Sequence, residues 1–97
     1  MTPEILTFEI DKIQSGVYRL AVTCGVEVTE PSVYGRIEEC IREGALAVPG
    51  GIAHFVEVRY HRLSSGTLRL SDAPGQAREI ADRLVALMAE MTEIEKQ

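Results

Sequence analysis

The sequence predicts an α+β fold, in which a two-layer ββαββα pseudo-repeat forms a four-stranded antiparallel sheet with two helices on one face. Apolar and polar residues alternate along four segments, which predicts half-buried strands. Two other segments have apolar residues at helical spacing, which predicts amphipathic helices. The chain has 97 residues. This length fits a single domain, 1–97, with related halves at about 5–44 and 52–94.

The first two predicted strands form a hairpin. Segments 5–12 and 17–28 both alternate, so each has one apolar face. A three-residue loop ending at Gly16 pairs Ile10 with Leu20 and keeps both on the apolar face, whereas a two-residue loop sets Ile10 against the polar face. The longer loop also places Gly16 in the left-handed conformation, where a Cβ is costly.

The second hairpin is predicted from an internal likeness. Segment 12–20 recurs as 62–70 with a constant shift, since 66 − 16 and 70 − 20 both give 50. The same loop then ends at Gly66, and Tyr60 faces Leu70 across the hairpin. Duplication of an ancestral half and convergent hairpin chemistry both account for this likeness.

Each hairpin is followed by a predicted helix. Thr29 is the expected N-cap of the first helix, with Pro31 in the first turn and Gly44 as the C-terminal stop. Asp72 is the expected cap of the second helix, and Pro74 follows it as Pro31 follows Thr29. The apolar stripe of the second helix comprises Ile80, Leu84, Leu87, Met88 and Met91.

Composition excludes several function classes. Hydrophobic residues make up 45% and charged residues 26%, which is typical of a globular domain. The net charge of −5 argues against general nucleic-acid binding, which gains affinity from cationic surfaces. Neither a secretory signal nor an apolar run of ~20 residues is present, so no membrane association is expected. Cys24 and Cys40 form no CxxC pair and are interpreted as reduced thiols of a cytoplasmic protein.

No catalytic residue, metal ion or cofactor is predicted. His54 is predicted on the apolar, core-facing side of its strand and His61 on the polar side, so the two cannot share a metal ion. Segment 49–51, Pro-Gly-Gly, precedes a strand and has no following Lys-Ser/Thr, so it is not a phosphate-binding loop. A nucleophile–base pair of Cys24 and His54 requires their strands to be neighbours, and buried thiols are usually inert.

The first function hypothesis is a non-enzymatic protein-interaction or regulatory module that is homodimeric. The polar face of the sheet is its candidate interaction surface, with Phe55 as an apolar anchor and Glu57, Arg59 and His61 as a charged rim. The alternative interpretation of this face is a solvated surface with cross-strand charge pairs.

Self-association has two candidate elements. The second strand, 17–28, is longer than the fourth, so part of it can pair with another chain. Met88 and Met91 lie at the end of the second helix, where they pack either in the core or on a partner.

The second function hypothesis is a small-molecule-binding domain or a minor enzyme. Its pocket is expected where the loop 45–51 meets the helices. The predicted ligand-binding residues are His54, Tyr34 and Cys24, because apolar walls with a few polar groups suit a ligand site.

Overall fold

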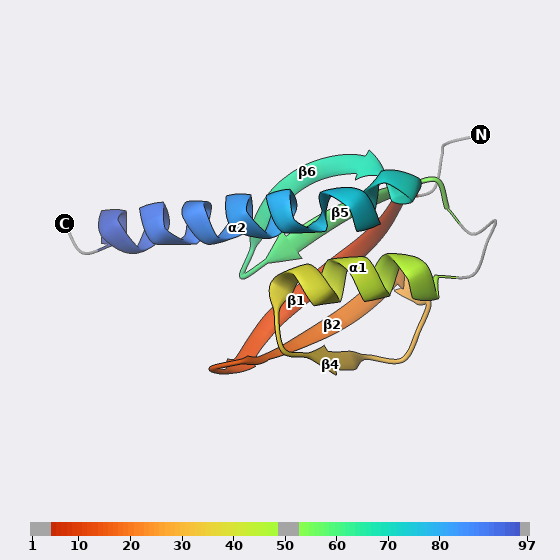
Figure 1. Cartoon of the computed structure of the whole chain (residues 1–97), viewed down its shortest axis with the longest axis horizontal. Helices are drawn as coiled ribbons and strands as arrows, with labels where there is room; N and C mark the ends of the chain where they lie inside the picture. The colour runs from red at the N-terminus through yellow and green to blue at the C-terminus, as the bar shows by residue number, and fades with distance from the viewer. Residues whose placement is uncertain (1–4, 49–52, 96–97) are drawn as a thin grey trace.

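The computed structural model describes residues 5–48 and 53–95, and it has an α+β fold with a mixed sheet and two helices (Figure 1). The predicted α+β class is therefore confirmed. Segment 49–51 of the predicted loop 45–51 lies outside the described residues. The strands are β1 (Ile5–Gln14), β2 (Val17–Cys24), β3 (Val26–Glu27), β4 (Ser32–Tyr34), β5 (Phe55–Tyr60) and β6 (Leu63–Arg69). The helical segments are α1 (Ile37–Ala47), the short 3-10 helix η1 (Leu70–Asp72) and α2 (Ala73–Glu95).

In the described residues the sheet is mixed and has six strands, so the prediction of a four-stranded, purely antiparallel sheet is wrong. Its order is β3-β2-β1-β5-β6, and β4 also pairs with β2. The central strands β1 and β5 run parallel and pair Leu6 with Val56 and Ile10 with Tyr60. All four of these side chains are buried. Strands with buried apolar side chains are typical of the centre of a sheet.

The outer edge of β2 is covered by the chain itself. β2 ends at Cys24, where Gly25 has a φ of +78° and the chain turns back as β3. Further on, β4 pairs with the start of β2, with Tyr34 opposite Tyr18. The prediction of one long strand over 17–28 is therefore wrong, and the edge proposed for pairing with another chain is occupied.

The first hairpin has the predicted register. Ile10 lies opposite Leu20, and Gly16 has a φ of +74°. The extra residue is accommodated in β1 rather than in the loop, because the register shifts between Lys12 and Gln14. The apolar pattern thus determines which residues face each other, while the position of the bulge depends on local backbone geometry.

The second hairpin differs from its prediction. Tyr60 pairs with Leu63 rather than with Leu70, and His61 and Arg62 form a two-residue turn. Gly66, with a φ of +91°, lies within β6 where the register shifts, so it belongs to a bulge instead of a turn. The observed register packs Leu63 against the core, whereas the predicted register, with its loop at 64–66, places Leu63 on the polar face of the sheet.

The start and end of the first helix were also predicted wrongly. α1 begins at Ile37 rather than after Thr29, because β4 precedes it and provides partners for the backbone of β2. Gly44 does not end the helix. It is buried within α1, where it packs against Phe8 and Leu20.

Both helices cover the same face of the sheet and enclose the core (Figure 1). α2 starts directly after Asp72, with Pro74 in its first turn, as predicted. Its C-terminal half continues beyond the turn that joins β5 and β6 (Figure 1). The largest fully buried side chains are those of Phe8, Leu6, Ile10, Ile41, Leu84, Val22, Val56, Val58 and Cys40.

Candidate functional site

The sheet face opposite the helices is called here the open face, since no described element covers it. Strand side chains alternate between the two faces, so every second residue of β1, β2, β5 and β6 reaches it. The structure places the predicted interaction residues Phe55, Glu57 and Arg59 on this face, and His61 in the adjoining turn. The open face comprises Thr7, Glu9, Asp11, Arg19, Ala21, Thr23, Phe55, Glu57, Arg59, Thr67 and Arg69.

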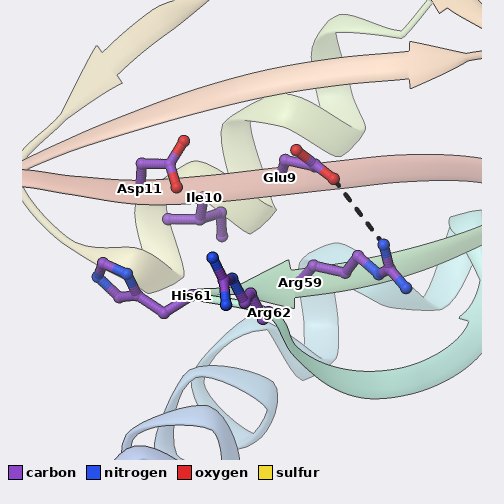
Figure 2. Close-up of a pocket in the computed structure, with 6 residues that line it drawn as sticks. All are labelled: Glu9, Ile10, Asp11, Arg59, His61 and Arg62. Carbon is purple, nitrogen blue, oxygen red and sulfur yellow. Dashed lines mark ion pairs between the residues drawn. The ribbon is translucent and has the colours of Figure 1, made fainter.

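A hollow of about 330 Å³ lies at one end of the open face (Figure 2). Its two walls have opposite charges, because the carboxylates come from β1 while the cationic side chains come from β5 and the turn after it. Such a hollow can bind a group that carries both charges, or a partner segment with an acidic and a basic side chain. The lining residues are Glu9, Ile10, Asp11, Arg59, His61 and Arg62.

The turn beside this hollow has an unfavourable backbone conformation. His61 has a φ of +48° and Arg62 a φ of +71°, both in the left-handed region. This conformation costs about 1–2 kcal/mol for a residue with a Cβ, and turns of this kind usually contain Asn-Gly. Because the pair His61-Arg62 is not typical of such a turn, the sequence does not predict the turn. Arg62 was therefore not identified as a site residue from the sequence.

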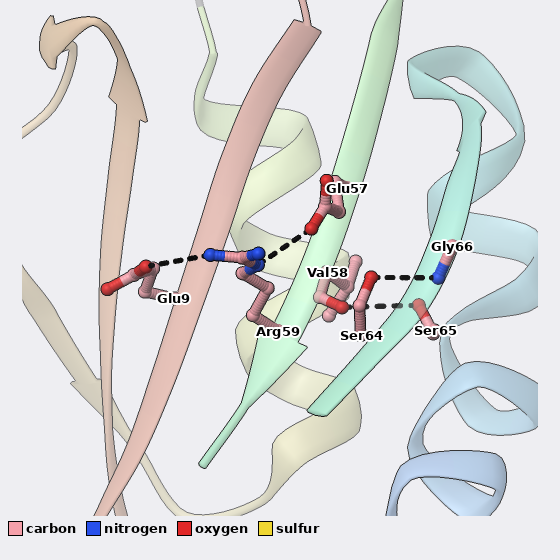
Figure 3. A network of polar contacts seen from close by, with 7 residues as sticks. All are labelled: Glu9, Glu57, Val58, Arg59, Ser64, Ser65 and Gly66. Carbon is pink, nitrogen blue, oxygen red and sulfur yellow. Dashed lines mark hydrogen bonds and ion pairs between the residues drawn. The ribbon is translucent and has the colours of Figure 1, made fainter. Parts of the chain in front are cut away.

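An ordered charge network connects two strands of the open face (Figure 3). Arg59 Nε donates a hydrogen bond of 2.7 Å to Glu57 Oε1 on the same strand. Arg59 Nη1 lies 4.0 Å from Glu9 Oε1 on β1. Exposed ion pairs contribute only about 0–1 kcal/mol each to stability, so the main effect of the network is to orient Arg59 between two carboxylates.

Polar contacts also hold the β6 bulge in place (Figure 3). Ser65 Oγ donates a hydrogen bond of 3.3 Å to the Val58 carbonyl oxygen, and the Gly66 N–H donates one of 3.1 Å to Ser64 Oγ. The bulge is therefore an organised part of the edge strand.

His54 lies at the other end of β5. It is exposed, so the prediction that it faces the core is wrong; its carbonyl accepts a hydrogen bond of 2.8 Å from the Leu70 N–H. A second hollow of about 330 Å³ includes His54 and adjoins the described part of the predicted loop. Its lining residues are Ala45, Leu46, Ala53, His54, Leu70, Ser71 and Pro74.

The other two predicted ligand-binding residues lie elsewhere. Tyr34 pairs with Tyr18 at the start of β2, and Cys24 pairs with Val26 at its end. Neither residue lines the hollow at His54. Cys24 and His54 are not on neighbouring strands either, because β1 lies between β2, which ends at Cys24, and β5, which begins directly after His54.

Cys40 is a residue of α1, and its thiol lies on the buried side of the helix. Its Sγ lies 4.0 Å from the Tyr18 carbonyl oxygen, to which it donates a weak hydrogen bond. Burial, with a smaller contribution from the charge of Glu39, raises the pKa of Cys40 from 9.0 to about 12. The thiol is therefore protonated at neutral pH and is a poor nucleophile.

Within residues 5–48 and 53–95, no three His, Cys, Asp or Glu side chains cluster closely enough to hold a metal ion. The helices in this part of the chain lack the apolar length that a membrane crossing requires. Comparisons with protein-family models, curated proteins and solved structures found no match for this chain.

Proposed function

We propose that the chain is a non-enzymatic protein-interaction or regulatory module that acts in the cytoplasm as a homodimer and holds a protein partner on its open face. The open face itself carries this proposal, because it is a broad uncovered surface on which Arg59 is oriented between Glu57 and Glu9. Phe55 is half-buried on the same face and supplies an apolar contact. On such a surface, charge complementarity governs the choice of partner and the association rate.

The turn at His61 and Arg62 also supports this proposal. Its left-handed conformation positions two cationic or ionisable side chains at the hollow, opposite the carboxylates of Glu9 and Asp11. Backbone strain of this kind is concentrated at sites of ligand or partner binding. A partner segment with side chains of both charges fits the two walls.

Site-specific photo-crosslinking in cells tests this proposal. A photoreactive residue at Thr67, exposed on the open face, should form a discrete product with one partner protein. The same residue at Glu79, exposed on α2, should not. Arg59→Ala should remove the Thr67 product without changing the circular dichroism spectrum. Identical products from both positions, or none from Thr67, would contradict a partner on the open face.

A small-molecule-binding domain is the second candidate function. The hollow at His54 supports it, since its volume of about 330 Å³ and its mainly apolar lining suit a small ligand. A metabolite that binds there should raise the melting temperature by mass action, and His54→Ala should reduce that shift. This candidate fails if no compound shifts the melting temperature, or if the shift is unchanged in the variant.

A further inference from the structure

The start of β5 and the end of β6 are held together at one end of the open face. Phe55 lies directly opposite Arg69 in the antiparallel pair of these strands. Next to this pair, the His54 carbonyl oxygen accepts a hydrogen bond of 2.8 Å from the Leu70 N–H. The chain then enters η1, which includes Ser71. These contacts bring together side chains from two distant parts of the sequence.

A hollow of about 460 Å³ lies among these side chains, and its lining in the described part of the chain is rich in hydrogen-bond donors. This volume is within the range of ligand pockets, about 300–1,000 Å³. The guanidinium carries five donors, the imidazole has an N–H in either protonation state, and the hydroxyl adds one more. No carboxylate is among the lining residues of residues 5–48 and 53–95, which are His54, Phe55, Arg69 and Ser71.

The donors of Arg69 are available to a ligand. Within the described residues, no hydrogen bond or ion pair engages its guanidinium, whereas two carboxylates hold that of Arg59. The side chains of His54 and Ser71 likewise have no partner in this part of the chain. A guanidinium binds a carboxylate or a phosphate through two parallel hydrogen bonds. The hollow therefore favours an anionic oxygen group.

Phe55 supplies an apolar wall beside these donors. Its side chain is half-buried, so part of the ring is exposed to the hollow. An exposed aromatic ring packs well against another planar ring, in an offset or edge-to-face arrangement. A ligand that places a ring on Phe55 can therefore direct an anionic substituent towards Arg69, its cross-strand neighbour.

We propose that this hollow binds a small molecule in which a planar ring carries a carboxylate or a phosphate group. Arg69 binds the anionic group, and His54 and Ser71 donate further hydrogen bonds to it. The ring of the ligand packs on Phe55. This site goes beyond both functions proposed above, because neither of them involves the binding of a small anion.

A free molecule is favoured over an anionic side chain of an extended peptide. Such a peptide would pair with the edge of β6, the strand that ends at Arg69. The bulge at Gly66 interrupts the regular ladder of this strand. Arg83 Nη1 also donates a hydrogen bond of 3.3 Å to the Ser65 carbonyl oxygen. Both features are typical of edge strands that avoid pairing with another chain.

Titration of the isotope-labelled full chain, followed by NMR, tests the proposal. Phenyl phosphate or benzoate should give saturable shifts of the amide signals of residues 54, 55, 69 and 71, with a Kd on the order of 1 mM or lower. Benzyl alcohol lacks the charge, while acetate and inorganic phosphate lack the ring. Each should bind about tenfold more weakly or less. No saturable shift with either probe, or equal binding of these comparison compounds, would overturn the proposal.

Substitutions separate the two parts of the site. Arg69→Gln should weaken binding of the probe about tenfold or more, because it removes a charged donor. Arg69→Lys, which keeps the charge without the planar fork, should bind with intermediate affinity. Phe55→Leu should remove most of the preference for the ring and leave the affinity for inorganic phosphate unchanged. A folded Arg69→Gln variant that binds as tightly as wild type would contradict the assigned role.

Two variants serve as matched controls. Arg19→Gln removes an exposed arginine elsewhere on the open face. Leu46→Ala changes the neighbouring hollow, which shares His54 with this one but is also lined by Leu46. Both variants should bind the probe as wild type does. Weaker binding in Leu46→Ala would place the probe in the neighbouring hollow and overturn the proposal.

A short peptide with phosphotyrosine distinguishes a free ligand from a protein ligand. It should bind no more tightly than phenyl phosphate, and an affinity more than about tenfold higher would overturn a free small molecule as the ligand. The photo-crosslinking experiment instead reports on a protein partner and depends on Arg59. The anion site and the proposed function can therefore fail separately.

Discussion

Gly44 shows how closely α1 approaches the sheet. A Cβ at this position would lie 2.6 Å from Leu20 Cδ2 and 3.1 Å from Phe8 Cε2. Both neighbours are themselves buried, so neither can move away freely. The sequence pattern identifies Gly44 as a helix stop, but glycine is required there because of tertiary packing. Rules for helix ends do not take such packing into account.

Gly44→Ala should lower the free energy of unfolding by about 1–3 kcal/mol through overpacking, although alanine favours helix by about 1 kcal/mol. Urea denaturation measures the change. Gly75→Ala is the matched control: it lies in the first turns of α2, with no atom within 4 Å of an added Cβ. The control should be neutral or gain about 0.4–1 kcal/mol. Equal stability of Gly44→Ala and wild type would contradict the close approach.

Gly16 and Gly66 have the same backbone requirement in different structures. Both have a positive φ, and neither has an atom within 4 Å of an added Cβ. Gly16→Val and Gly66→Val should each lose about 1–2 kcal/mol through backbone strain alone. Thermal unfolding measures the loss, and Thr67→Val beside Gly66 is the control with ordinary strand geometry. Valine variants as stable as wild type would show that neither position requires a left-handed residue.

At the scale of elements, substitutions in the turn of the second hairpin can distinguish its observed register from the predicted one. The observed register places residues 61 and 62 in a left-handed turn, for which Asn-Gly is the preferred pair. The double variant His61→Asn, Arg62→Gly should therefore gain about 1–2 kcal/mol of stability by relieving strain. Arg62→Ala keeps a Cβ in the left-handed region and should show no such gain. A less stable double variant would favour the predicted register, in which glycine weakens a strand.

Element boundaries were predictable only where local pattern and tertiary contact agree. The first hairpin register follows from alternation alone, because a slip by one residue would expose its apolar set. β4 was missed because Tyr34, Ile37 and Ile41 also fit helical spacing. The deciding factor is the edge of β2, with which residues 32–34 pair as β4. Neither strand alternation nor helical spacing reports on such a tertiary contact.

The candidate site was predictable to the same extent. Strand parity places Phe55, Glu57 and Arg59 on the polar face, where the structure has them. The hollow was not predictable, since it depends on β1 lying directly beside β5. Strand order likewise separates Tyr34 from the hollow at His54, a separation that no local pattern encodes.

At the scale of the whole molecule, the buried side chains of Cys40 and Tyr60 link stability to alkaline pH. Burial raises the pKa of both groups, with Tyr18 adding to the shift at Tyr60. The folded protein therefore retains these protons at a pH where the unfolded chain has released them. For Cys40 the full contribution to stability is present below pH 9.0 and is lost as pH rises towards about 12.

Thermal melts between pH 8 and 12 should accordingly show a declining melting temperature. Cys40→Ala should decline less steeply than wild type, since the variant lacks the thiol and keeps Tyr60. Cys24→Ala, at the half-buried cysteine, is the comparison variant. Parallel pH profiles for wild type and Cys40→Ala would mean that the thiol has no part in the decline.

The parallel pairing of β1 with β5 determines how the two halves of the chain relate in space. The hairpin partners lie on opposite sides of this central pair, β2 beside β1 and β6 beside β5, while both helices cover one face. To place one hairpin on the other with the strand directions matched, it must be rotated by a half-turn about the strand axis. After this rotation, the side of the hairpin that faced the core faces away from it. The halves thus have opposite handedness relative to the core, and no single rotation superposes them.

The likeness of segments 12–20 and 62–70 consequently produces no internal twofold axis. A monomer has one open face, and this face is not repeated by any symmetry between the two halves. The proposed homodimer would introduce the missing symmetry. Each dimer would then carry two open faces, and it should bind two partner molecules for every pair of chains.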